Sequence, residues 1–321
     1  MPETKSMQKG SPEVSRAGVG TRARGDVLSV VIPAYNEAGA IAGVLEQVTA
    51  VLGELGVESE IIVVDDCSTD ETATLAEKAG VQVLRNVQNG GYGYSLMRGI
   101  RAARFPAVAI IDADGSYPAA KLLDLFEEYR RGLAMVVGHR HGAHYMTSWR
   151  MRILRWLFRR VVQFIVGRPV PDVNSGMRVF DRDAVLPLLP HMSYGFSFTT
   201  SITLLFMMQA LPVSYVPVEY LKRTGSSKVR YARDSLRALQ IITSITVRLN
   251  PIKLFILAAV VNVLIMLPVV GVLALWGDAR TFIVIVLQVS ALLVGLGLVV
   301  EALIEKSPFE DSSRTDTDRA L

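Results

Sequence analysis

The sequence contains one cysteine, Cys67, among its 321 residues. A single thiol cannot form an internal disulfide, which excludes a disulfide-stabilised secreted scaffold and predicts a reducing compartment for the polar part of the chain. The first 25 residues lack the apolar core of a signal peptide and are rich in Ser, Gly, Lys and Arg. We therefore expect residues 1–25 to form a disordered N-terminal tail.

Charged residues are absent from two long segments near the C-terminus. Residues 254–276 and 281–300 form runs of 23 and 20 residues without Asp, Glu, Lys or Arg. At about 1.5 Å per helical residue, each run can cross a hydrocarbon core of about 30 Å. The pattern excludes a soluble cytosolic enzyme. It predicts two transmembrane helices within residues 252–304, joined as a hairpin and followed by a polar tail at 305–321.

Basic residues are scarce beyond the start of this hairpin. Only 4 of the 34 Lys and Arg residues follow Leu254, whereas 30 precede it. Several of them lie in residues 221–251, which we interpret as a basic, amphipathic juxtamembrane segment. The positive-inside rule then predicts a cytoplasmic catalytic domain on an inner or plasma membrane. A second Arg-rich stretch, residues 149–166, fits either an anionic leaflet surface or an ordinary solvated helix with one buried side.

Residues 26–220 alternate short apolar runs with longer helical patterns. The runs predict strands at 28–32, 60–64, 81–84, 107–111 and 134–137, with helices at 40–55, 71–79, 94–103 and 119–131 between them. Such alternation is typical of an α/β domain with a mostly parallel sheet and crossover helices. Ligands bind such sheets at the carboxyl ends of the strands.

Acidic residues gather at two of those strand ends. Asp65 and Asp66 follow the second predicted strand, and Asp112 and Asp114 follow the fourth. Helix capping accounts for the nearby Asp70 but not for these four carboxylates together. Two aspartates at positions i and i+2 can hold one hard cation through carboxylate oxygens, with phosphate oxygens as further ligands. The sequence therefore favours a site for Mg²⁺ or Mn²⁺.

Five motifs occur along the chain in a fixed order: Val31-Ile-Pro-Ala-Tyr-Asn-Glu37, Val63-Val-Asp-Asp-Cys-Ser-Thr-Asp70, Asp112-Ala-Asp-Gly115, Asn174-Ser-Gly-Met-Arg178 and Lys222-Arg-Thr-Gly-Ser-Ser-Lys228. The first three resemble family-2 glycosyltransferases of GT-A fold. The last two, with the membrane hairpin, resemble the polyprenyl-phosphate branch that includes dolichol-phosphate mannosyltransferase. The resemblance implies a Rossmann-like GT-A domain over residues 26–220. It also implies transfer of a sugar from a UDP- or GDP-hexose to undecaprenyl or dolichyl phosphate.

The resemblance also implies roles for particular positions. Asp112 and Asp114 would hold the divalent metal. Asp172 would be a catalytic or sugar-positioning carboxylate, and Arg178 would meet a phosphate of the donor or of the lipid. The nucleotide-sugar would lie on Pro33, Ala34, Tyr35, Glu37, Asp65, Asp66, Asp112, Ala113 and Asp114. The lipid phosphate would lie on Arg223, Ser227 and Lys228.

The expected reaction needs little proton transfer. A lipid monophosphate has a second pKa of about 6, so at neutral pH it is largely dianionic and already nucleophilic. Direct attack would invert the anomeric centre. Tyr92 stands where the mannosyltransferases usually carry the Lys of a Gly-Lys-Gly turn, which leaves the choice between uridine and guanosine open.

Two other functions remain open from the sequence. A polysaccharide synthase, which transfers to a sugar hydroxyl, shares the GT-A motifs, but residues 152–156 lack the Gln of its Gln-x-x-Arg-Trp motif. The second is an inactive scaffold that binds nucleotide-sugar. The expected partners are a nucleotide-sugar, a polyprenyl phosphate and the bilayer. Nucleic acid is not expected, and a homo-oligomer stays open.

Overall fold

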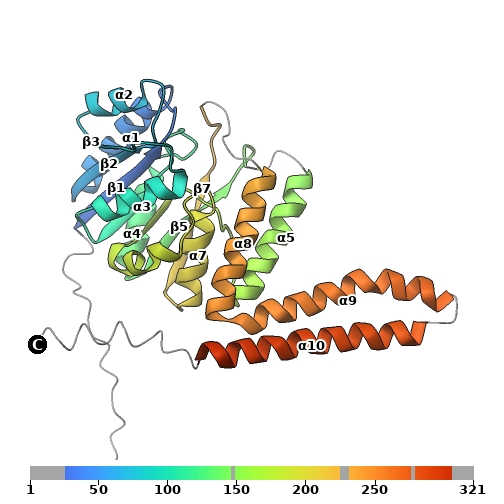
Figure 1. Cartoon of the computed structure of the whole chain (residues 1–321). Coiled ribbons are helices and arrows are strands. Elements are labelled where there is room, and N and C mark those ends of the chain that lie inside the picture. Colours follow the sequence, from blue (N-terminus) through green and yellow to red (C-terminus); the bar gives the residue numbers. More distant parts are fainter. Residues whose placement is uncertain (1–25, 146–148, 225–230, 276–278, 306–321) are drawn as a thin grey trace, which may run out of the picture.

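The computed structural model describes residues 26–145, 149–224, 231–275 and 279–305 (Figure 1). The strands are β1 (Val27–Ala34), β2 (Glu58–Asp65), β3 (Gln82–Arg85), β4 (Ala107–Ile110), β5 (Met135–His141), β6 (Arg178–Asp181) and β7 (Val213–Glu219). The helices of the polar domain are α1 (Ile41–Leu55), α2 (Thr72–Lys78), α3 (Tyr92–Ala102), α4 (Lys121–Arg130), α5 (Trp149–Val166), α6 (Arg182–Val185), the 3₁₀ helix η1 (Leu186–His191) and α7 (Phe198–Met208). The C-terminal helices are α8 (Tyr231–Leu249), α9 (Pro251–Leu275) and α10 (Ala279–Glu305).

The seven strands form one sheet in the order β3-β2-β1-β4-β6-β5-β7. All neighbouring pairs are parallel except those of β6, which runs antiparallel to both β4 and β5. The five predicted strands are confirmed as β1 to β5. Two strands, β6 and β7, were not expected from the sequence. The four residues of β6 begin with Arg178 and end with Asp181, a pattern that does not indicate a buried strand, and Pro217 interrupts the strand pattern of β7, which lies at the edge of the sheet.

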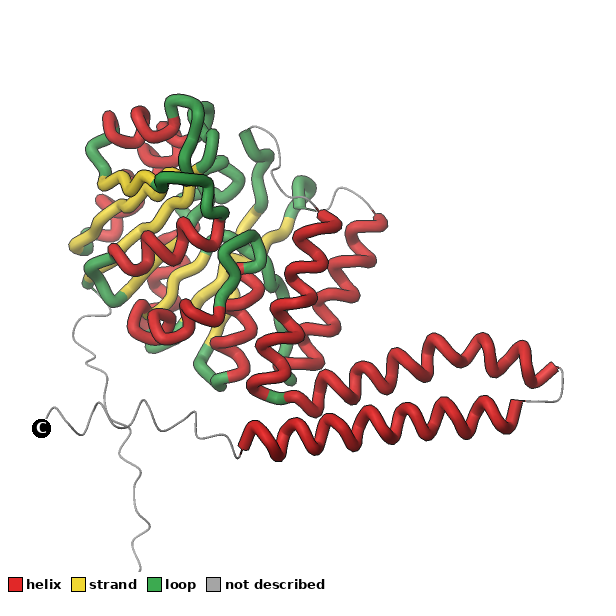
Figure 2. Tube along the Cα trace, viewed as in Figure 1, coloured by secondary structure: helices red, strands yellow, loops and turns green. Residues whose placement is uncertain are grey.

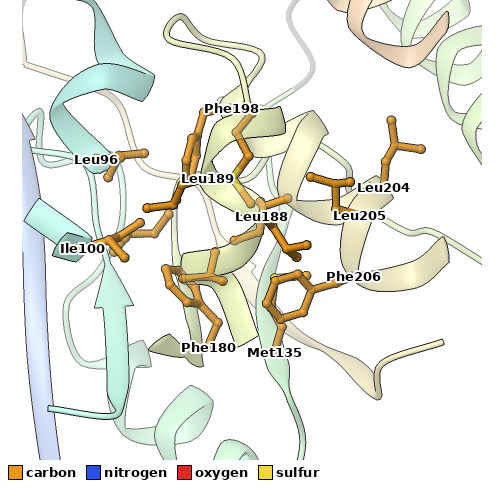
Figure 3. Packing of buried hydrophobic residues seen from close by; sticks show 14 of the residues in the cluster. Leu96, Ile100, Met135, Phe180, Leu188, Leu189, Phe198, Leu204, Leu205 and Phe206 are labelled. Carbon is orange, nitrogen blue, oxygen red and sulfur yellow. The ribbon is translucent and has the colours of Figure 1, made fainter. Parts of the chain in front are cut away.

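The sheet is covered on both faces, which explains its continuous apolar runs. In β1, Val30, Val31 and Ile32 are fully buried. Helices α1 and α4 pack on one face. Helices α3 and α7 pack on the other, where Leu96, Ile100, Phe180, Phe198 and Phe206 form the cluster that Figure 3 shows.

Two amphipathic helices connect this domain to the C-terminal hairpin. Helices α5 and α8 lie beside α7, and both end at the start of α9 (Figure 1). The Lys253 ammonium at the first turn of α9 donates to the Ile165 carbonyl of α5 at 2.8 Å. Helix α8 ends at Leu249, two residues before α9 begins. The catalytic domain is therefore held at the base of the hairpin from two sides.

Helices α9 and α10 run antiparallel along their length (Figure 2). Segments of 25 and 24 residues within them are long and apolar enough to cross a membrane. Gly297 permits close packing, because a Cβ there would lie 2.8 Å from the Cβ of Phe255. The Asn262 amide donates to the Ser290 hydroxyl at 3.1 Å and so satisfies a polar group inside the pair. The predicted tails, residues 1–25 and 306–321, lie outside the described residues.

Candidate active site

A cavity of about 1510 Å³ opens at the carboxyl ends of β1, β2 and β4. Its size exceeds the roughly 300–1,000 Å³ that holds a drug-sized ligand. Most residues expected from the sequence to bind nucleotide-sugar line it: Pro33, Ala34, Tyr35, Glu37, Asp66, Asp112, Ala113 and Asp114. Arg223 and Arg237 reach it from the segment before the apolar helices α9 and α10, and Tyr194, Gly195 and Phe196 reach it from the loop before α7.

The acidic pair Asp112 and Asp114 lies just beyond the end of β4. Asp112 accepts a hydrogen bond from the Tyr92 hydroxyl at 2.8 Å, and Asp114 forms an ion pair with Arg223. Burial and the neighbouring charge of Asp114 raise the pKa of Asp112 to about 6. Burial and Asp112 likewise raise the pKa of Tyr92, so its phenol keeps the proton that it donates.

The backbone of the Asn-Ser-Gly motif closes around Asp112. A Cβ at Gly176 would lie 2.3 Å from Asp112 Oδ2 and 2.6 Å from Oδ1, so no side chain fits at this position. The Gly176 N–H donates to the Tyr117 hydroxyl at 2.7 Å, which fixes the motif beside the pair. Two motifs that are some 60 residues apart in the sequence thus form one wall.

The donor atoms of the acidic pair fit a hard divalent cation. They are carboxylate oxygens, which suit Mg²⁺ or Mn²⁺ better than the softer metals. In the described part of the chain, no group of three or more His, Cys, Asp or Glu residues could hold a metal. A cation here would therefore need phosphate or water oxygens as its other ligands, which is the arrangement expected when the metal arrives with a nucleotide diphosphate.

Asp65 and Asp66, adjacent in the sequence, have different surroundings. Asp66 accepts from the N–H groups of Gly90 and Gly91, both at 2.8 Å, and from the Asn86 amide at 2.6 Å. It therefore holds the turn that leads into α3. Asp65 is 4% exposed, and its Oδ1 atom has no hydrogen-bond partner among the described residues. Asp65 lies outside the cavity lining but retains an unused acceptor, as a residue that binds a nucleoside hydroxyl or N–H would.

The glycine-rich turn before α3 lies directly against the loop before α7. A Cβ at Gly93 would lie 2.1 Å from the Ser193 carbonyl oxygen, and one at Gly91 would lie 2.9 Å from that of Tyr194. Gly91 also has a φ of +94°, which strains any other residue. The Tyr94 N–H donates to the Tyr194 carbonyl at 2.9 Å. These glycines join two cavity walls and do not form a dinucleotide fingerprint.

Asp172 is engaged by an arginine that the sequence analysis did not single out. Its carboxylate is 2% exposed and accepts from Arg140 Nε at 2.8 Å and Nη2 at 2.9 Å. Burial opposes ionisation, but the charge and hydrogen bonds of Arg140 hold the pKa of Asp172 below its ordinary value. The Arg140 guanidinium also lies 4.8 Å from the Tyr145 ring centroid. Asp172 is thus an ionised partner of Arg140.

Arg178 corrects a second expectation. Its side chain is fully buried and donates to the carbonyls of Ser175 at 2.9 Å and Val173 at 2.8 Å, and to the Thr203 hydroxyl at 2.7 Å. Burial lowers its pKa. With its donors used inside the protein, Arg178 fastens the Asn-Ser-Gly loop to α7 and does not face the cavity. In this structure Arg178 therefore makes no contact with the cavity in which a phosphate would lie.

The expected lipid-phosphate residues are only partly described. Arg223 lines the cavity and pairs with Asp114, so it lies next to the acidic pair. Ser227 and Lys228 lie outside the described residues. Among the described residues, Arg237 on α8 also lines the cavity, and a Cβ at Gly195 would lie 3.7 Å from its guanidinium. The sequence analysis noted Arg237 only as part of a basic segment.

Comparison with known proteins gives the family. Residues 29–188 match glycosyl transferase family 2. An uncharacterized glycosyltransferase of Mycobacterium tuberculosis is 36% identical over 176 residues, which cover 51% of this chain and 72% of that protein. The chain belongs to glycosyl transferase family 2.

Two further proteins are similar to this glycosyltransferase. A dolichyl-phosphate hexose transferase of Haloferax volcanii is 30% identical over 208 residues, covering 64% of this chain and 87% of that protein. The crystal structure of glucosyl-3-phosphoglycerate synthase from M. tuberculosis, in complex with Mn²⁺, UDP and phosphoglyceric acid, aligns with a TM-score of 0.57 at 20% identity. That alignment covers 69% of this chain and 78% of the synthase. The expected family, GT-A fold class and glycosyltransferase activity are confirmed.

Replacing Asp112 should stabilise this glycosyltransferase in the absence of metal. The pKa of about 6 in the folded state lies above the ~3.9 of an unfolded aspartate, so the folded protein binds more protons between about pH 4 and 6. The ionised carboxylate therefore costs stability above about pH 6. We expect Asp112→Asn to melt above the wild type at pH 7.5 in EDTA, with the difference shrinking toward pH 5. A lower melting temperature for the variant at pH 7.5 would contradict the unfavourable charge.

Replacing Arg178 should cost stability and leave ligand affinity unchanged. Arg178→Met leaves several buried acceptors without a hydrogen bond, and each such acceptor lowers the free energy of unfolding by roughly 1–3 kcal/mol. The melting temperature should therefore fall by at least ~4 °C. Nucleotide affinity of the folded variant, measured by titration below its melting range, should stay within about twofold of the wild type. Arg131→Met is the matched control, because that exposed arginine forms an ion pair with Glu128 on the surface of the domain. Selective loss of nucleotide affinity in Arg178→Met would restore the phosphate role.

Proposed function

We propose that this protein transfers a hexose from UDP- or GDP-hexose to a polyprenyl phosphate, undecaprenyl or dolichyl, with inversion at the anomeric carbon. The reaction would take place on the cytoplasmic face of an inner or plasma membrane. One observation carries the proposal: the cavity with the acidic pair is lined also by Arg223 and Arg237, from the segment that leads into two apolar helices. The similarity to a dolichyl-phosphate hexose transferase supports the acceptor class.

The donor is proposed to lie along the carboxyl ends of β1, β2 and β4. Tyr35 and Glu37 border the end of the cavity next to β1. Asp65 lies just behind this lining, and its proposed contact with the nucleoside requires a shift that exposes its unpaired oxygen. The acidic pair lies toward the side of Arg223. The M. tuberculosis synthase of similar fold was crystallised with UDP and Mn²⁺, which supports a nucleoside diphosphate as the ligand class.

Mg²⁺ or Mn²⁺ on Asp112 and Asp114 would neutralise the diphosphate and stabilise the departing nucleoside diphosphate. The chain contributes the fixed positions of these carboxylates. Tyr92 and Gly176 confine Asp112, while Arg223 balances the charge of Asp114. Such preorganisation matters because a misplaced ligand weakens every later electrostatic contact.

Attack by the acceptor phosphate requires nearby positive charge and no general base. It is a dianion near neutral pH, so the obstacle is the approach of two anions. Arg223 and Arg237 supply positive charge at the cavity, and we propose that Ser227 and Lys228 add to it. Asp172 takes no proton in this scheme. Its proposed role is to hold Arg140, which forms cation–π contacts with Tyr145 and Tyr220.

The membrane orientation is proposed from α5 and α8. Both helices lie across the direction of the α9–α10 hairpin at its base (Figure 1). Large apolar side chains on them are exposed: Trp156 is 50%, Leu157 is 52% and Leu236 is 69% exposed. Arginines are interleaved among them, a combination typical of helices that lie in the headgroup region of an anionic leaflet.

Transfer should be visible directly as a glycosylated lipid. The full-length protein in nanodiscs, incubated with undecaprenyl or dolichyl phosphate and a panel of UDP- and GDP-hexoses, should give one hexosyl phospholipid by mass spectrometry. Excess EDTA or Asp114→Ala should remove most turnover, and added Mn²⁺ should restore the EDTA-treated wild type. A product with the hexose on a sugar hydroxyl and no glycosylated lipid phosphate would overturn the acceptor. Full turnover in EDTA would overturn the metal.

The position of α5 can be read from tryptophan fluorescence. The chain has three tryptophans, of which Trp149 and Trp156 lie on α5, so Trp276→Phe leaves a reporter of that helix. In nanodiscs with brominated acyl chains we expect strong quenching, because the rings lie at the headgroup boundary. As a control, Ala50→Trp on the exposed side of α1, in a variant without the natural tryptophans, should not be quenched. If the brominated lipid quenches the α5 tryptophans no more than the control tryptophan, α5 lies in water.

A further inference from the structure

Tyr92 connects the acidic pair to the loop before α7. It is the first residue of α3 and lies in the cavity wall. Its hydroxyl donates to Asp112 Oδ1 at 2.8 Å, and its ring stacks on Phe196 with a centroid distance of 5.6 Å and an interplanar angle of 19°. One side chain thus contacts both a carboxylate expected to bind metal and the loop on the other side of the cavity.

We propose that Tyr92 is a positioning residue for the divalent cation: its hydroxyl fixes one oxygen of Asp112 and leaves the other for the cation. The proposal rests on the proposed function only for the presence of a cation on the acidic pair. It gives Tyr92, which belongs to neither the acidic motif nor the Asn-Ser-Gly motif, a role in metal binding.

The carboxylate of Asp112 has little freedom between its neighbours. On one side the Tyr92 hydroxyl holds Oδ1, and on the other the Gly176 backbone lies so close that a Cβ would come within 2.6 Å of either oxygen. Asp114, two residues along, is held separately through Arg223 and the Ser116 N–H. Among the described residues, the contact with Gly176 would be the restriction left on rotation of the carboxylate without the Tyr92 hydroxyl, and a rotating ligand binds a cation less tightly.

The ring of Tyr92 is fixed by a second set of contacts. Gly91 and Gly93, on either side of it, permit the backbone of residues 193–195 to approach, and Tyr94 N–H bonds to the Tyr194 carbonyl. This contact carries Phe196 to its place on the Tyr92 ring. The loop before α7 therefore determines where the hydroxyl lies, and so acts on Asp112 through Tyr92.

The hydroxyl and the ring can be tested separately by metal binding. Tyr92→Phe retains the ring and removes the hydroxyl, whereas Phe196→Leu retains the hydroxyl and removes the stacked ring. Mn²⁺ affinity is measured on the full-length protein by electron paramagnetic resonance, with UDP or GDP present and no acceptor. We expect the Mn²⁺ Kd to rise about tenfold in Tyr92→Phe, as for loss of a hydrogen bond to a charged group, and by a smaller factor in Phe196→Leu.

A matched control removes a buried tyrosine hydroxyl elsewhere. Tyr129→Phe on α4, where the ring stacks on Phe126 in the core, should leave the Mn²⁺ Kd within twofold of the wild type. In turnover assays the Tyr92→Phe defect should appear mainly as a higher KM for Mn²⁺, with kcat recovering at saturating Mn²⁺. A protein with damaged packing would instead lose kcat at every metal concentration.

The outcomes separate this inference from the proposed function. A raised Kd in Tyr92→Phe, with the control unchanged, supports the positioning role even if no lipid is glycosylated. A Kd within twofold of the wild type in Tyr92→Phe overturns it, and if that variant does not fold, an unchanged Kd in Phe196→Leu does so. If the wild type binds no Mn²⁺ with either nucleotide, the metal part of the proposed function fails and this inference fails with it.

Discussion

The repulsion between Asp112 and Asp114 is the constraint on which the rest of this site depends. Burial, and after it the neighbouring charge of Asp114, raise the pKa of Asp112, so the two carboxylates resist ionising together. The surrounding chain compensates with Arg223 on one carboxylate and the Tyr92 hydroxyl on the other. It does not neutralise the pair completely, which leaves a place where a cation accompanied by phosphate is favoured.

Four arginines near the site fall into two groups according to what they contact. Arg140 is paired with Asp172 and Arg178 is bonded to carbonyls and a hydroxyl, so both act inside the protein. Arg223 and Arg237 line the cavity. The internal arginines organise the walls, and the cavity-lining ones remain near enough to act on anions. Burying a guanidinium costs desolvation free energy, so a buried arginine stabilises the fold only when its N–H groups are hydrogen-bonded.

Helix α7 connects the site to the apolar hairpin of α9 and α10. The Arg178 guanidinium ties the Asn-Ser-Gly loop to Thr203 on α7, and α7 packs against α5 and α8. Those helices meet the start of α9, where Lys253 bonds to Ile165. The acidic pair, the loop before α7 and the hairpin are therefore connected through packed helices, which fixes how far the cavity lies from the apolar helices.

The sequence by itself determined the elements and the edge of the sheet that carries the site. Apolar runs of strand length, separated by helical patterns, gave β1 to β5 and the edge at which Asp112 and Asp114 lie, because these signals are local. Charge-free runs likewise identified the two C-terminal helices. Strands β6 and β7 were not predicted, since the four residues of β6 have charged ends and no apolar period, and Pro217 interrupts β7.

The tertiary structure alone decided what the polar side chains do. Asp172 was expected to be a catalytic or sugar-positioning carboxylate, and in the structure its oxygens accept hydrogen bonds from Arg140, 32 residues away. Arg178 was expected to contact a phosphate, and in the structure it donates to the Thr203 hydroxyl and to two backbone carbonyls. Tyr92 was noted only because it replaces the lysine of the mannosyltransferases, and in the structure its hydroxyl donates to Asp112. A motif records which residue is present, whereas hydrogen-bond donors and charges are satisfied by whichever groups folding brings within about 3 Å, and those groups are distant in sequence.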